Sequence, residues 1–343
     1  MPSPLHVPVA KISAIKSHPN ADSLDIAEVL GWQCVVGRDQ FKAGDKITYF
    51  PPDTMLPLEL SDKWNVTQYL SKQRIRATRL RGEPSFGLVM PCENDDWNVG
   101  DNVAEFYGAT KWEPPTREVR QRGSNAFYIA NPDHLPGNSL FPDYTHIVNL
   151  RHFPDLFGSD ELVVVTEKLH GTNSRVGIID GERMAGSHRV RRGQGDTLYW
   201  SPWSQPGVEA MLTQLAKHHK QVVLYGEILG SDVQSLDYGY KGHEGYAAFD
   251  LMVDGRYVDY STFAVLCYRF DLQEVPLLYE GPFDFNVIKE FAKGDTFLSA
   301  DHLREGVVVK PLIERHDPRV GRAVAKYVSD DYLLAKHSDF AEV

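Results

Sequence analysis

The chain has 343 residues, of which 42% are hydrophobic and 24% are charged, and its formal net charge is −11. This length predicts two domains, each able to bury its own core, and the negative charge argues against non-specific nucleic-acid binding over the whole surface. No apolar run is long enough for a membrane helix, and the N-terminus lacks the basic and apolar regions of a secretory signal. We therefore expect a cytoplasmic, intracellular protein.

Residues 5–110 are predicted to form short β-strands separated by turn sequences rich in Gly, Asn, Asp and Pro. Many short strands at this spacing suggest a small β-barrel. The predicted strands are Val7–Ile15, Ile26–Val29, Gln33–Val36, Lys46–Phe50 and Phe86–Met90.

A basic run interrupts these strands between Lys72 and Arg81, where no acidic residue occurs. Alternate residues of a strand project from one face, so such a run can form a positive stripe for a nucleic-acid backbone. The alternative is a solvated strand face without a ligand. We favour nucleic-acid binding, and the candidate residues are Arg74, Arg76, Arg79 and Arg81.

Two motifs in this region resemble the tRNA-binding type of OB-fold. The first is His-Pro-Asn-Ala-Asp, starting at His18, and the second is Arg-Gly-x-x-Ser-x-Gly, from Arg81 to Gly87. The resemblance implies an OB-fold that binds single strands or duplex ends through a sheet face and loops.

The composition changes over residues 111–150, which are rich in Pro, Gly and Asn and are expected to be irregular. We predict an OB-fold domain over residues 1–115, a linker over 116–149 and a second domain over 150–343. The three cysteines are far apart, without metal-binding spacing, and we expect them to be small buried residues. They are Cys34, Cys92 and Cys267.

The second region has mixed patterns, so the chain as a whole is predicted to be α+β. The loop from Gly193 to Gly207 is expected to be irregular, with its tryptophans covering an edge of the core. The predicted helices are Gly207–His218 and Phe285–Ala292, and the predicted strands are Leu162–Thr166, Arg175–Ile179, Val222–Ile228, Tyr246–Met252 and Gly306–Lys310.

The most informative stretch runs from Val163 to Asn173, where a β-branched apolar run ends in Glu167 and Lys168, with Gly171 three residues later. A buried strand that ends in a lysine, before a backbone able to bend sharply, can hold an amine nucleophile rigidly. The tetrapeptide Lys-x-x-Gly is weak by itself, because one match is expected by chance and a solvated strand-end lysine would explain it.

Further charged and aromatic residues follow in order near predicted strand ends. Together they could position a triphosphate, neutralise the charge of an in-line displacement and hold a divalent cation. Each has a structural alternative, such as a salt bridge for Glu227, a core ring for Phe249 or a surface charge for Lys326. The full series is Arg189, Glu227, Phe249, Glu305, Lys310 and Lys326.

This order resembles the covalent nucleotidyltransferase superfamily of ATP-dependent ligases and capping enzymes. The segment from Glu167 to Asn173, Glu-Lys-Leu-His-Gly-Thr-Asn, is similar to the nick-sealing RNA ligases, and an OB domain before it resembles the Deinococcus type. The resemblance implies an N-terminal OB-fold β-barrel followed by a ligase adenylation (ATP-grasp-like) domain of antiparallel sheets flanked by helices.

The resemblance also implies an activity: an ATP-dependent RNA ligase that joins a 3′-hydroxyl RNA end to a 5′-phosphate end. The substrate would be a nick in duplex RNA or in an RNA–DNA hybrid, and the intermediates would be lysyl-AMP and a polynucleotide adenylate. ATP, Mg²⁺ or Mn²⁺ and a monomeric protein would be expected.

Residue roles carried over from the resemblance begin with Lys168, which would form the phosphoamide to AMP, and Glu305, which would act with the metal. Lys326, together with Lys310, would face the α-phosphate, although Val324 stands where the family usually has the first lysine of Lys-x-Lys. The other nucleotide contacts would come from Glu167, Gly171, Asn173, Arg189, Glu227 and Phe249.

Two other functions stay open at this point. The short stretch after Lys326 speaks against a DNA ligase or a cap-type guanylyltransferase with a C-terminal barrel, but a guanylyltransferase that uses GTP is the enzymatic alternative. A non-catalytic tRNA- or RNA-binding OB protein is the other, and it leaves the ordered motifs after residue 166 unexplained.

Overall fold

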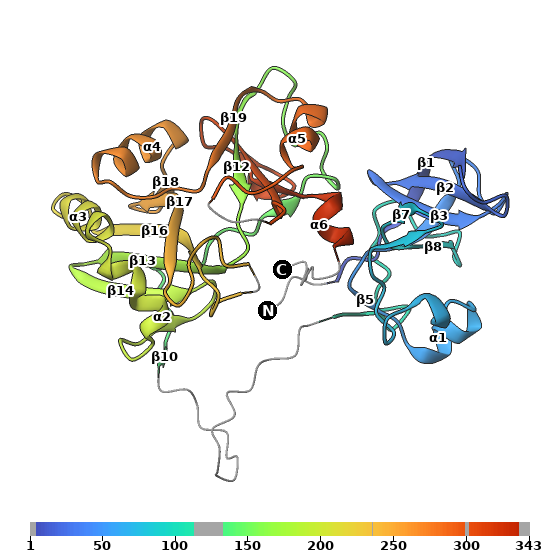
Figure 1. The fold of residues 1–343 in the computed structure, drawn as a ribbon, viewed down its shortest axis with the longest axis horizontal. Coiled ribbons are helices and arrows are strands. Elements are labelled where there is room, and N and C mark those ends of the chain that lie inside the picture. Colours follow the sequence, from blue (N-terminus) through green and yellow to red (C-terminus); the bar gives the residue numbers. More distant parts are fainter. Residues whose placement is uncertain (1–4, 113–132, 235, 299–301, 336–343) are drawn as a thin grey trace, which may run out of the picture. The chain divides into compact units, whose positions relative to one another are not determined.

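The computed structural model describes residues 5–112, 133–234, 236–298 and 302–335. The chain forms two compact units, one of Met1–Arg120 with Leu333–Val343 and the other of Gln121–Tyr332 (Figure 1). In the described part of the chain, no helix has the length and apolar character needed to cross a membrane.

The first unit is built on a curved antiparallel sheet with the order β3-β2-β1-β4-β8. All five strands predicted for this region are present, with ends shifted by a few residues. Phe86 N–H donates to the carbonyl of Gln33 on β3, which brings the chain before β8 toward the opposite edge of the sheet, as in a partly open OB-type barrel. The strands are β1 (Val9–Ser17), β2 (Leu24–Val29), β3 (Trp32–Gly37), β4 (Lys46–Phe50) and β8 (Leu88–Pro91).

Shorter elements close this unit around one apolar core. In β3, Trp32, Cys34 and Val36 are buried and alternate with partly exposed residues, the period expected of a strand with one buried face. Near β4, Phe50 packs edge to face on Trp64 and Tyr107. The additional elements are β5 (Thr54–Met55), α1 (Leu58–Lys63), η1 (Thr67–Tyr69), β6 (Thr78–Leu80), β7 (Glu83–Ser85) and β9 (Thr110–Lys111).

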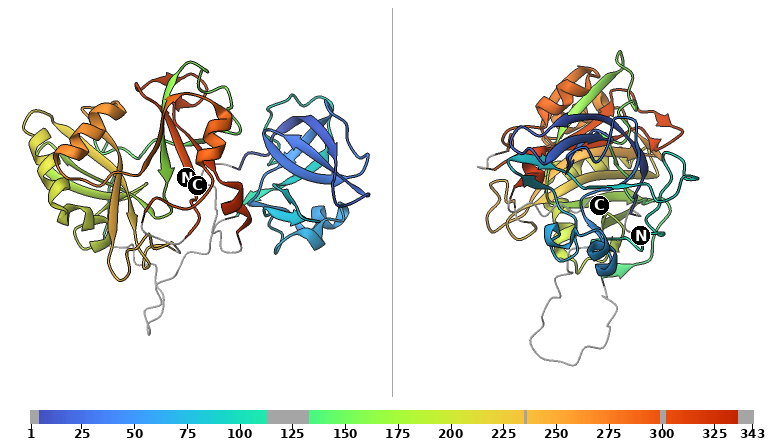
Figure 2. Two further views of the ribbon diagram at one scale, coloured as in Figure 1. Left: turned by 45° about the horizontal axis from the view of Figure 1, so that its top comes forward. Right: turned by 90° about the vertical axis from the view of Figure 1, so that its right-hand side faces the viewer.

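The second unit contains two larger sheets (Figures 1 and 2). The seven-stranded sheet has the order β10 (His134–Leu135), β15 (Arg191–Arg192), β14 (Glu182–Ser187), β13 (Thr172–Ile179), β16 (Gln221–Leu229), β17 (Gly245–Val253) and β18 (Arg256–Tyr257). The five-stranded sheet has the order β11 (Val148–Asn149), β23 (Ala325–Val328), β20 (Gly306–Pro311), β12 (Leu162–Lys168) and β19 (Leu277–Pro282). Among the strands that the structure describes in these two sheets, every strand pairing is antiparallel except that of β11 with β23, so the antiparallel α+β prediction is confirmed.

Helices cover one face of the seven-stranded sheet. Side chains of β16 alternate between its faces, with Val222 and Leu224 in the core that α3 and α4 complete, and Val223 and Tyr225 in a second core on the other face. Both predicted helices are present and slightly shorter, whereas α4 was not predicted. The remaining elements are α2 (Thr197–Trp200), η2 (Ser201–Ser204), α3 (Pro206–Leu215), α4 (Tyr260–Arg269), α5 (Phe285–Phe291), β21 (His316–Asp317), β22 (Gly321–Arg322) and α6 (Asp330–Leu334).

Part of the predicted linker contributes to this second unit. Residues 113–132 lie outside the described residues, but β10 pairs with β15 and β11 pairs with β23. Strands of two residues carry no periodic pattern, which is why the sequence did not indicate them.

Two of the three cysteines fit the prediction of small buried residues. Cys34 and Cys267 are buried, whereas Cys92 is partly exposed. Burial raises the pKa of each buried thiol to about 12, so neither provides a thiolate at neutral pH.

Candidate functional site

Lys168 ends β12, and the register of the five-stranded sheet sets its partner. Lys168 pairs with Gly306 of β20, so Glu305 precedes β20 directly beside it. The Lys168 ammonium donates to Oε1 of Glu305 at 2.6 Å, and the lysine side chain is 23% exposed whereas that of Glu305 is 4% exposed. The amine is therefore held by a buried carboxylate yet remains accessible.

Three lysines share one face of this sheet. Side chains alternate along a strand, and directly paired residues project to the same side. Lys168 pairs with Gly306, Lys326 with Val308, and Lys310 lies two residues further along β20. At 3.4 Å per residue along the strands, Lys326 is about 7 Å from the Lys168 row and Lys310 about 14 Å, so Lys326 is the nearer of the two to Lys168.

Glu167 faces the opposite way from Lys168 and is 1% exposed. Its Oε2 accepts a hydrogen bond from the backbone of Phe297 at 2.9 Å and lies 3.6 Å from Nε of Arg304. The Arg304 guanidinium in turn donates to three backbone carbonyls, those of Phe291, Lys293 and Asp295. The Glu167 carboxylate thus positions the segment before Glu305.

A second group of site residues lies in the seven-stranded sheet, at the end of the sheet where strand β13 begins and strand β16 finishes. Asn173 pairs with Glu227, and the N–H of Gly171 donates to Oε1 of Glu227 at 3.0 Å. A Cβ on Gly171 would lie 2.2 Å from the carbonyl oxygen of Ile228, so this close approach requires glycine. Arg189 follows β14 at the same end of the sheet, and its side chain is exposed.

Phe249 lies in a β-bulge of β17. The pairing with β16 jumps from Tyr225–Asp250 to Gly226–Ala248, which leaves Phe249 as the extra residue; bulges commonly re-aim a side chain near a site. Its ring is partly buried and lies 4.9 Å from that of Tyr144, edge to face.

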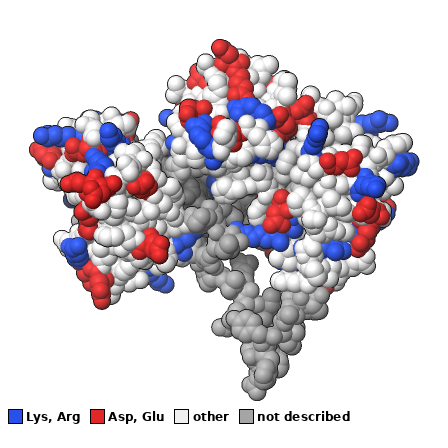
Figure 3. Space-filling view, turned by 180° about the vertical axis from the view of Figure 1, so that it is seen from behind, with Lys and Arg blue, Asp and Glu red and all other residues white. Residues whose placement is uncertain are grey.

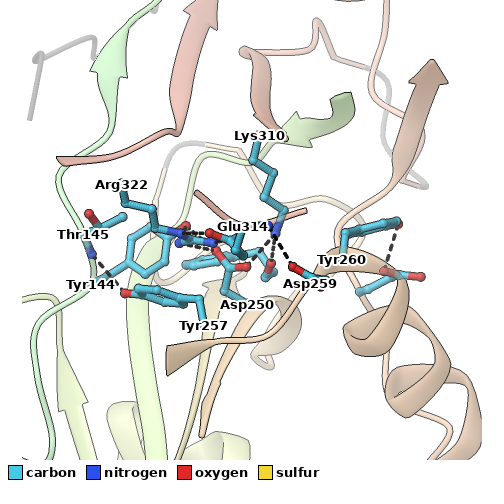
Figure 4. Close-up of polar contacts among 11 residues, drawn as sticks. Tyr144, Thr145, Asp250, Tyr257, Asp259, Tyr260, Lys310, Glu314 and Arg322 are labelled. Carbon is cyan, nitrogen blue, oxygen red and sulfur yellow. Dashed lines mark hydrogen bonds and ion pairs between the residues drawn. The ribbon is translucent and has the colours of Figure 1, made fainter. Parts of the chain in front are cut away.

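Lys310 does not point toward Lys168. Its ammonium donates to the carbonyl of Phe249 at 2.9 Å and to Oδ1 of Asp250 at 2.6 Å, as Figure 4 shows for Asp250. Asp250 also accepts from Arg322 at 2.9 Å and from Tyr144 at 2.5 Å. Burial alone would raise the pKa of Asp250, but the neighbouring Arg322 and Lys310 charges bring it down to about 2.

The site also contains buried oxygen atoms that the protein leaves unsatisfied. Among the described residues, Oε1 of Glu167, Oδ1 of Asn173 and Oε2 of Glu305 are buried without a hydrogen bond, which is uncommon enough to suggest ligand contacts. Burial raises the pKa of Glu227 to about 8, although the nearby Lys168 favours its charged form. A carboxyl group that titrates near neutral pH is typical of functional sites.

Hard oxygen donors are therefore present, but the protein does not supply a complete metal site. Within the described ranges, no three His, Cys, Asp or Glu side chains gather around one point. The unsatisfied Oε2 of Glu305 fits a cation such as Mg²⁺, which binds through one or two carboxylates and completes its shell with phosphate oxygens and water.

Several contacts were not predicted from the sequence. His170 donates its backbone N–H to Tyr238 Oη at 2.7 Å, and its Nδ1 lies 3.8 Å from Oε2 of Glu305. Thr172 Oγ1 lies 3.0 Å from Tyr199 Oη. Tyr199 and Tyr238 belong to irregular or short elements without a periodic pattern, whereas the position of His170 within Lys-x-His-Gly was an available signal.

The segment from Gly193 to Gly207 was wrongly predicted to be irregular, because it contains α2 and η2, but its tryptophans cover the core as predicted. Trp203 is buried and donates to the carbonyl of Met184, and Trp200 donates to the carbonyl of Arg192. Both rings pack against the core of the seven-stranded sheet.

In the first unit, the four candidate arginines differ in exposure. Arg74 donates to Asp53 at 2.7 Å and stacks on the ring of Trp112 at 3.4 Å, so it stabilises this unit, whereas Arg76, Arg79 and Arg81 are exposed. On the face drawn in Figure 3, basic and acidic side chains are interspersed. A nucleic-acid site would therefore be local.

Family comparisons agree with this geometry. Residues 161–328 match the RNA ligase family model, and residues 6–92 match an OB-fold domain model. A comparison with curated protein sequences gave no significant match.

The fold is similar to solved structures of an RNA ligase from Naegleria gruberi. The structure with pyrophosphate is 24% identical, with a TM-score of 0.78, and the match covers 98% of this chain and 100% of that one. A variant with AMP and manganese gives a TM-score of 0.76 at 24% identity, covering 97% and 99%. A second variant, with ATP and manganese, gives 0.76 at 24% identity, covering 95% and 98%. These matches establish a common fold.

Proposed function

We propose, from the match of residues 161–328 to the RNA ligase family model and of residues 6–92 to an OB-fold domain model, that this chain is an ATP-dependent ligase that seals nicks in RNA. It joins a 3′-hydroxyl end to a 5′-phosphate end in duplex RNA or an RNA–DNA hybrid. The observation that carries the proposal is Lys168, an accessible amine fixed at a strand end by Glu305.

The proposed reaction consists of three transfers. The Lys168 amine attacks the α-phosphorus of ATP, forming a P–N bond, losing a proton and breaking the bond to pyrophosphate. A 5′-phosphate oxygen then attacks the same phosphorus, forming the polynucleotide adenylate and releasing the amine. Finally the 3′-hydroxyl attacks the 5′-phosphorus and AMP leaves. Alignment and electrostatics provide most of the rate in such reactions.

In this proposal the nucleotide lies between the two sheets of the second unit. Lys326 contacts the α-phosphate because it is the nearer lysine on the Lys168 face, and Arg189 contacts a phosphate from the edge of the other sheet. Asn173 and Glu227 bind the nucleotide there, with Glu227 on the ribose. Gly171 allows the backbone to approach the nucleotide closely.

For Lys310 and Glu167, the proposed roles differ from those that the sequence resemblance implied. Lys310 holds the carbonyl of Phe249, so it supports the adenine-stacking ring instead of the α-phosphate. Glu167 is turned away from the Lys168 face, and only its unsatisfied Oε1 is available to the nucleotide.

A divalent cation, Mg²⁺ or Mn²⁺, would be held by Glu305 together with phosphate oxygens. When bound, it supplies positive charge that stabilises the phosphoryl oxygens during displacement. The cation would use the unsatisfied Oε2, while Lys168 is bonded to Oε1, so the same carboxylate would contact both the cation and the amine. All assigned residues come from one chain, so we propose that a monomer is active.

The domain division is part of the proposal. Residues 1–115 bind nucleic acid through Arg76, Arg79 and Arg81, and residues 150–343 carry out adenylyl transfer. Deletion of residues 1–110 should then impair nick sealing more than adenylylation of Lys168, and equal loss of both steps would contradict this division.

The test is to mix the protein with magnesium and ATP labelled at the α-phosphate, beside Lys168→Ala. Covalent label on the wild type alone supports the first transfer, and sealing of a nicked duplex with a ribose 3′-hydroxyl supports the rest. Label from GTP but not ATP would replace the proposal with a guanylyltransferase. No label from either nucleotide would reject it.

A further inference from the structure

The β6–β7 hairpin of the first unit carries two of the exposed arginines at its tip. Its two-residue turn consists of Arg81 and Gly82, with φ of 50° and 93°, the conformation that matches the twist of paired strands. Glycine adopts positive φ freely, whereas arginine does so at a cost. The surroundings must therefore hold Arg81 in this conformation, and such positions often mark functional sites.

Contacts from the β1–β2 loop hold the carbonyl just before the turn and the first carbonyl within it. The buried His18 accepts the backbone N–H of Asn20 at Nδ1 at 3.0 Å, so its proton is on Nε2, which donates to the carbonyl of Leu80 at 3.0 Å. The Asn20 side-chain amide donates to the carbonyl of Arg81 at 3.1 Å. A Cβ on Gly82 would lie 3.3 Å from that amide, so a larger residue would disturb the contact.

The other strand of the hairpin is fixed to the main sheet. Gln33 Nε2 donates to the carbonyl of Pro84 at 2.9 Å, and the N–H of Val35 donates to Ser85 Oγ at 3.0 Å. With both strands anchored, Arg79 and Arg81 remain exposed. Arg79 also donates to the carbonyl of Gly82 at 3.2 Å, which directs it over the turn.

Charge around the tip favours an anion. The acidic neighbours are Asp22, which is exposed in the β1–β2 loop, and Asp25, which is buried and lies 3.6 Å from Arg38. Glu83 accepts from Gln33 at 3.3 Å. One exposed acid thus stands against the two tip arginines, and the β1–β2 loop is one of the loops with which OB-folds bind oligonucleotides.

We propose that His18 and Asn20 form a latch that positions Arg79 and Arg81 for contacts with neighbouring phosphates of the nucleic-acid substrate. The latch explains why the motif around His18 and the motif around Gly82 occur together in one chain: they meet at this turn. The inference rests on the proposed function, because it takes the RNA-ligase substrate as the ligand.

The experiment measures binding of a fluorescent nicked RNA duplex by anisotropy between about 50 and 200 mM salt. Replacing both arginines (R79Q with R81Q) should lower the slope of log affinity against log salt by about two, since each phosphate contact contributes about one. Asn20→Ala, at an exposed position, should weaken binding about threefold or more and lower the slope by up to one. Lys63→Gln on α1 is the control, an exposed lysine 3.5 Å from Glu93, and should change neither.

A double-mutant comparison separates positioning from general stability. In the variant that lacks both arginines, adding Asn20→Ala should not weaken RNA binding further. The thermal midpoint of the single variant Asn20→Ala should equal that of the wild type. Equal weakening in both backgrounds, or wild-type binding by Asn20→Ala, would overturn the latch.

Binding of a nicked DNA duplex should show the same losses in affinity, and a loss confined to RNA would overturn phosphate contact. Labelling of Lys168 by ATP is measured in parallel: if the wild type fails to label, the proposed function fails, whereas normal labelling with unaffected binding rejects the latch alone.

Discussion

The Lys168 ammonium at the end of β12 and the Glu305 carboxylate, just before the adjacent strand β20, are 2.6 Å apart. This ion pair has two consequences for the proposed transfer of AMP to Lys168. It keeps the amine at a fixed point, and it places the amine beside the carboxylate that is proposed to bind the cation. Lys168, the proposed nucleophile, and Glu305, the proposed metal ligand, are therefore in direct contact.

Glu305→Gln tests this pair. The amide keeps the shape of the side chain but loses the charge that would bind the cation, so the rate of Lys168 adenylylation should fall by about 100-fold or more, the usual cost of removing one electrostatic contributor. The measurement is label incorporation at saturating ATP and magnesium, with Lys168→Ala as the blank. A rate within threefold of wild type would contradict the role of Glu305.

Glu227→Gln tests the environment of the second carboxylate. Its pKa is about 8 in the folded protein because of burial and about 4.3 in an unfolded chain, so the folded state keeps a proton that the unfolded state releases. Stability from this group is present at low pH and is lost as pH rises from about 5 to 8. Glu227→Gln has no carboxyl group at this position, so its stability does not fall with pH for this reason.

The free energy of unfolding of Glu227→Gln, relative to wild type, should therefore increase by at least about 1.4 kcal/mol between pH 5 and pH 8.5, which is the equivalent of one pKa unit. Urea denaturation at both pH values measures the difference, and effects of other groups cancel. A relative stability that decreases with pH would show that Glu227 is charged in the folded protein.

Lys310→Met tests the support of Phe249. Removal of one partner from a buried ion pair costs about 3 kcal/mol or more, and here it also frees the Phe249 carbonyl. We expect this loss in stability together with a higher KM for ATP. Glu290→Gln is the control, because its pair with Lys293 is exposed and should contribute no more than about 0.5 kcal/mol. An unchanged KM would mean that Phe249 does not depend on Lys310.

Much of the fold could be predicted because its strands carry strong patterns. The run from Val163 to Val165 is β-branched and buried, and the ends of β12 were predicted within a few residues. By contrast, β10 and β11 have two residues each, and α4 contains β-branched and aromatic residues with weak helix propensity. Tertiary packing decides these elements, with β10 and α4 on the seven-stranded sheet and β11 in the five-stranded sheet, and a single sequence does not show it.

The candidate site, like the fold, could be predicted from the sequence only in part. Motif order grouped Lys168, Glu227 and Glu305. In the structure Lys168 contacts Glu305, and both lie close enough to Glu227 to act on its pKa, while the roles assigned to the three remain predictions. The partners of charged residues were not visible in the sequence: nothing local predicts that Arg74 binds Asp53 or that Lys310 binds Asp250, each pair being separated by many residues. Long-range ion pairs determine which basic residues are available for a ligand.

Gly306→Ala tests how strongly the site depends on strand spacing. A Cβ there would lie 2.2 Å from the carbonyl oxygen of Tyr327 and 2.8 Å from Cα of Val328, both backbone atoms of β23 that cannot move aside alone. We expect β20 and β23 to separate, at a cost of about 1–3 kcal/mol, and Glu305 to shift. Adenylylation should fall by at least tenfold. Gly158→Ala is the matched control, because a Cβ at that glycine meets nothing within 4 Å. Thermal unfolding and label incorporation should be unchanged in the control, and equal behaviour of the two variants would show that Glu305 is not positioned by this contact.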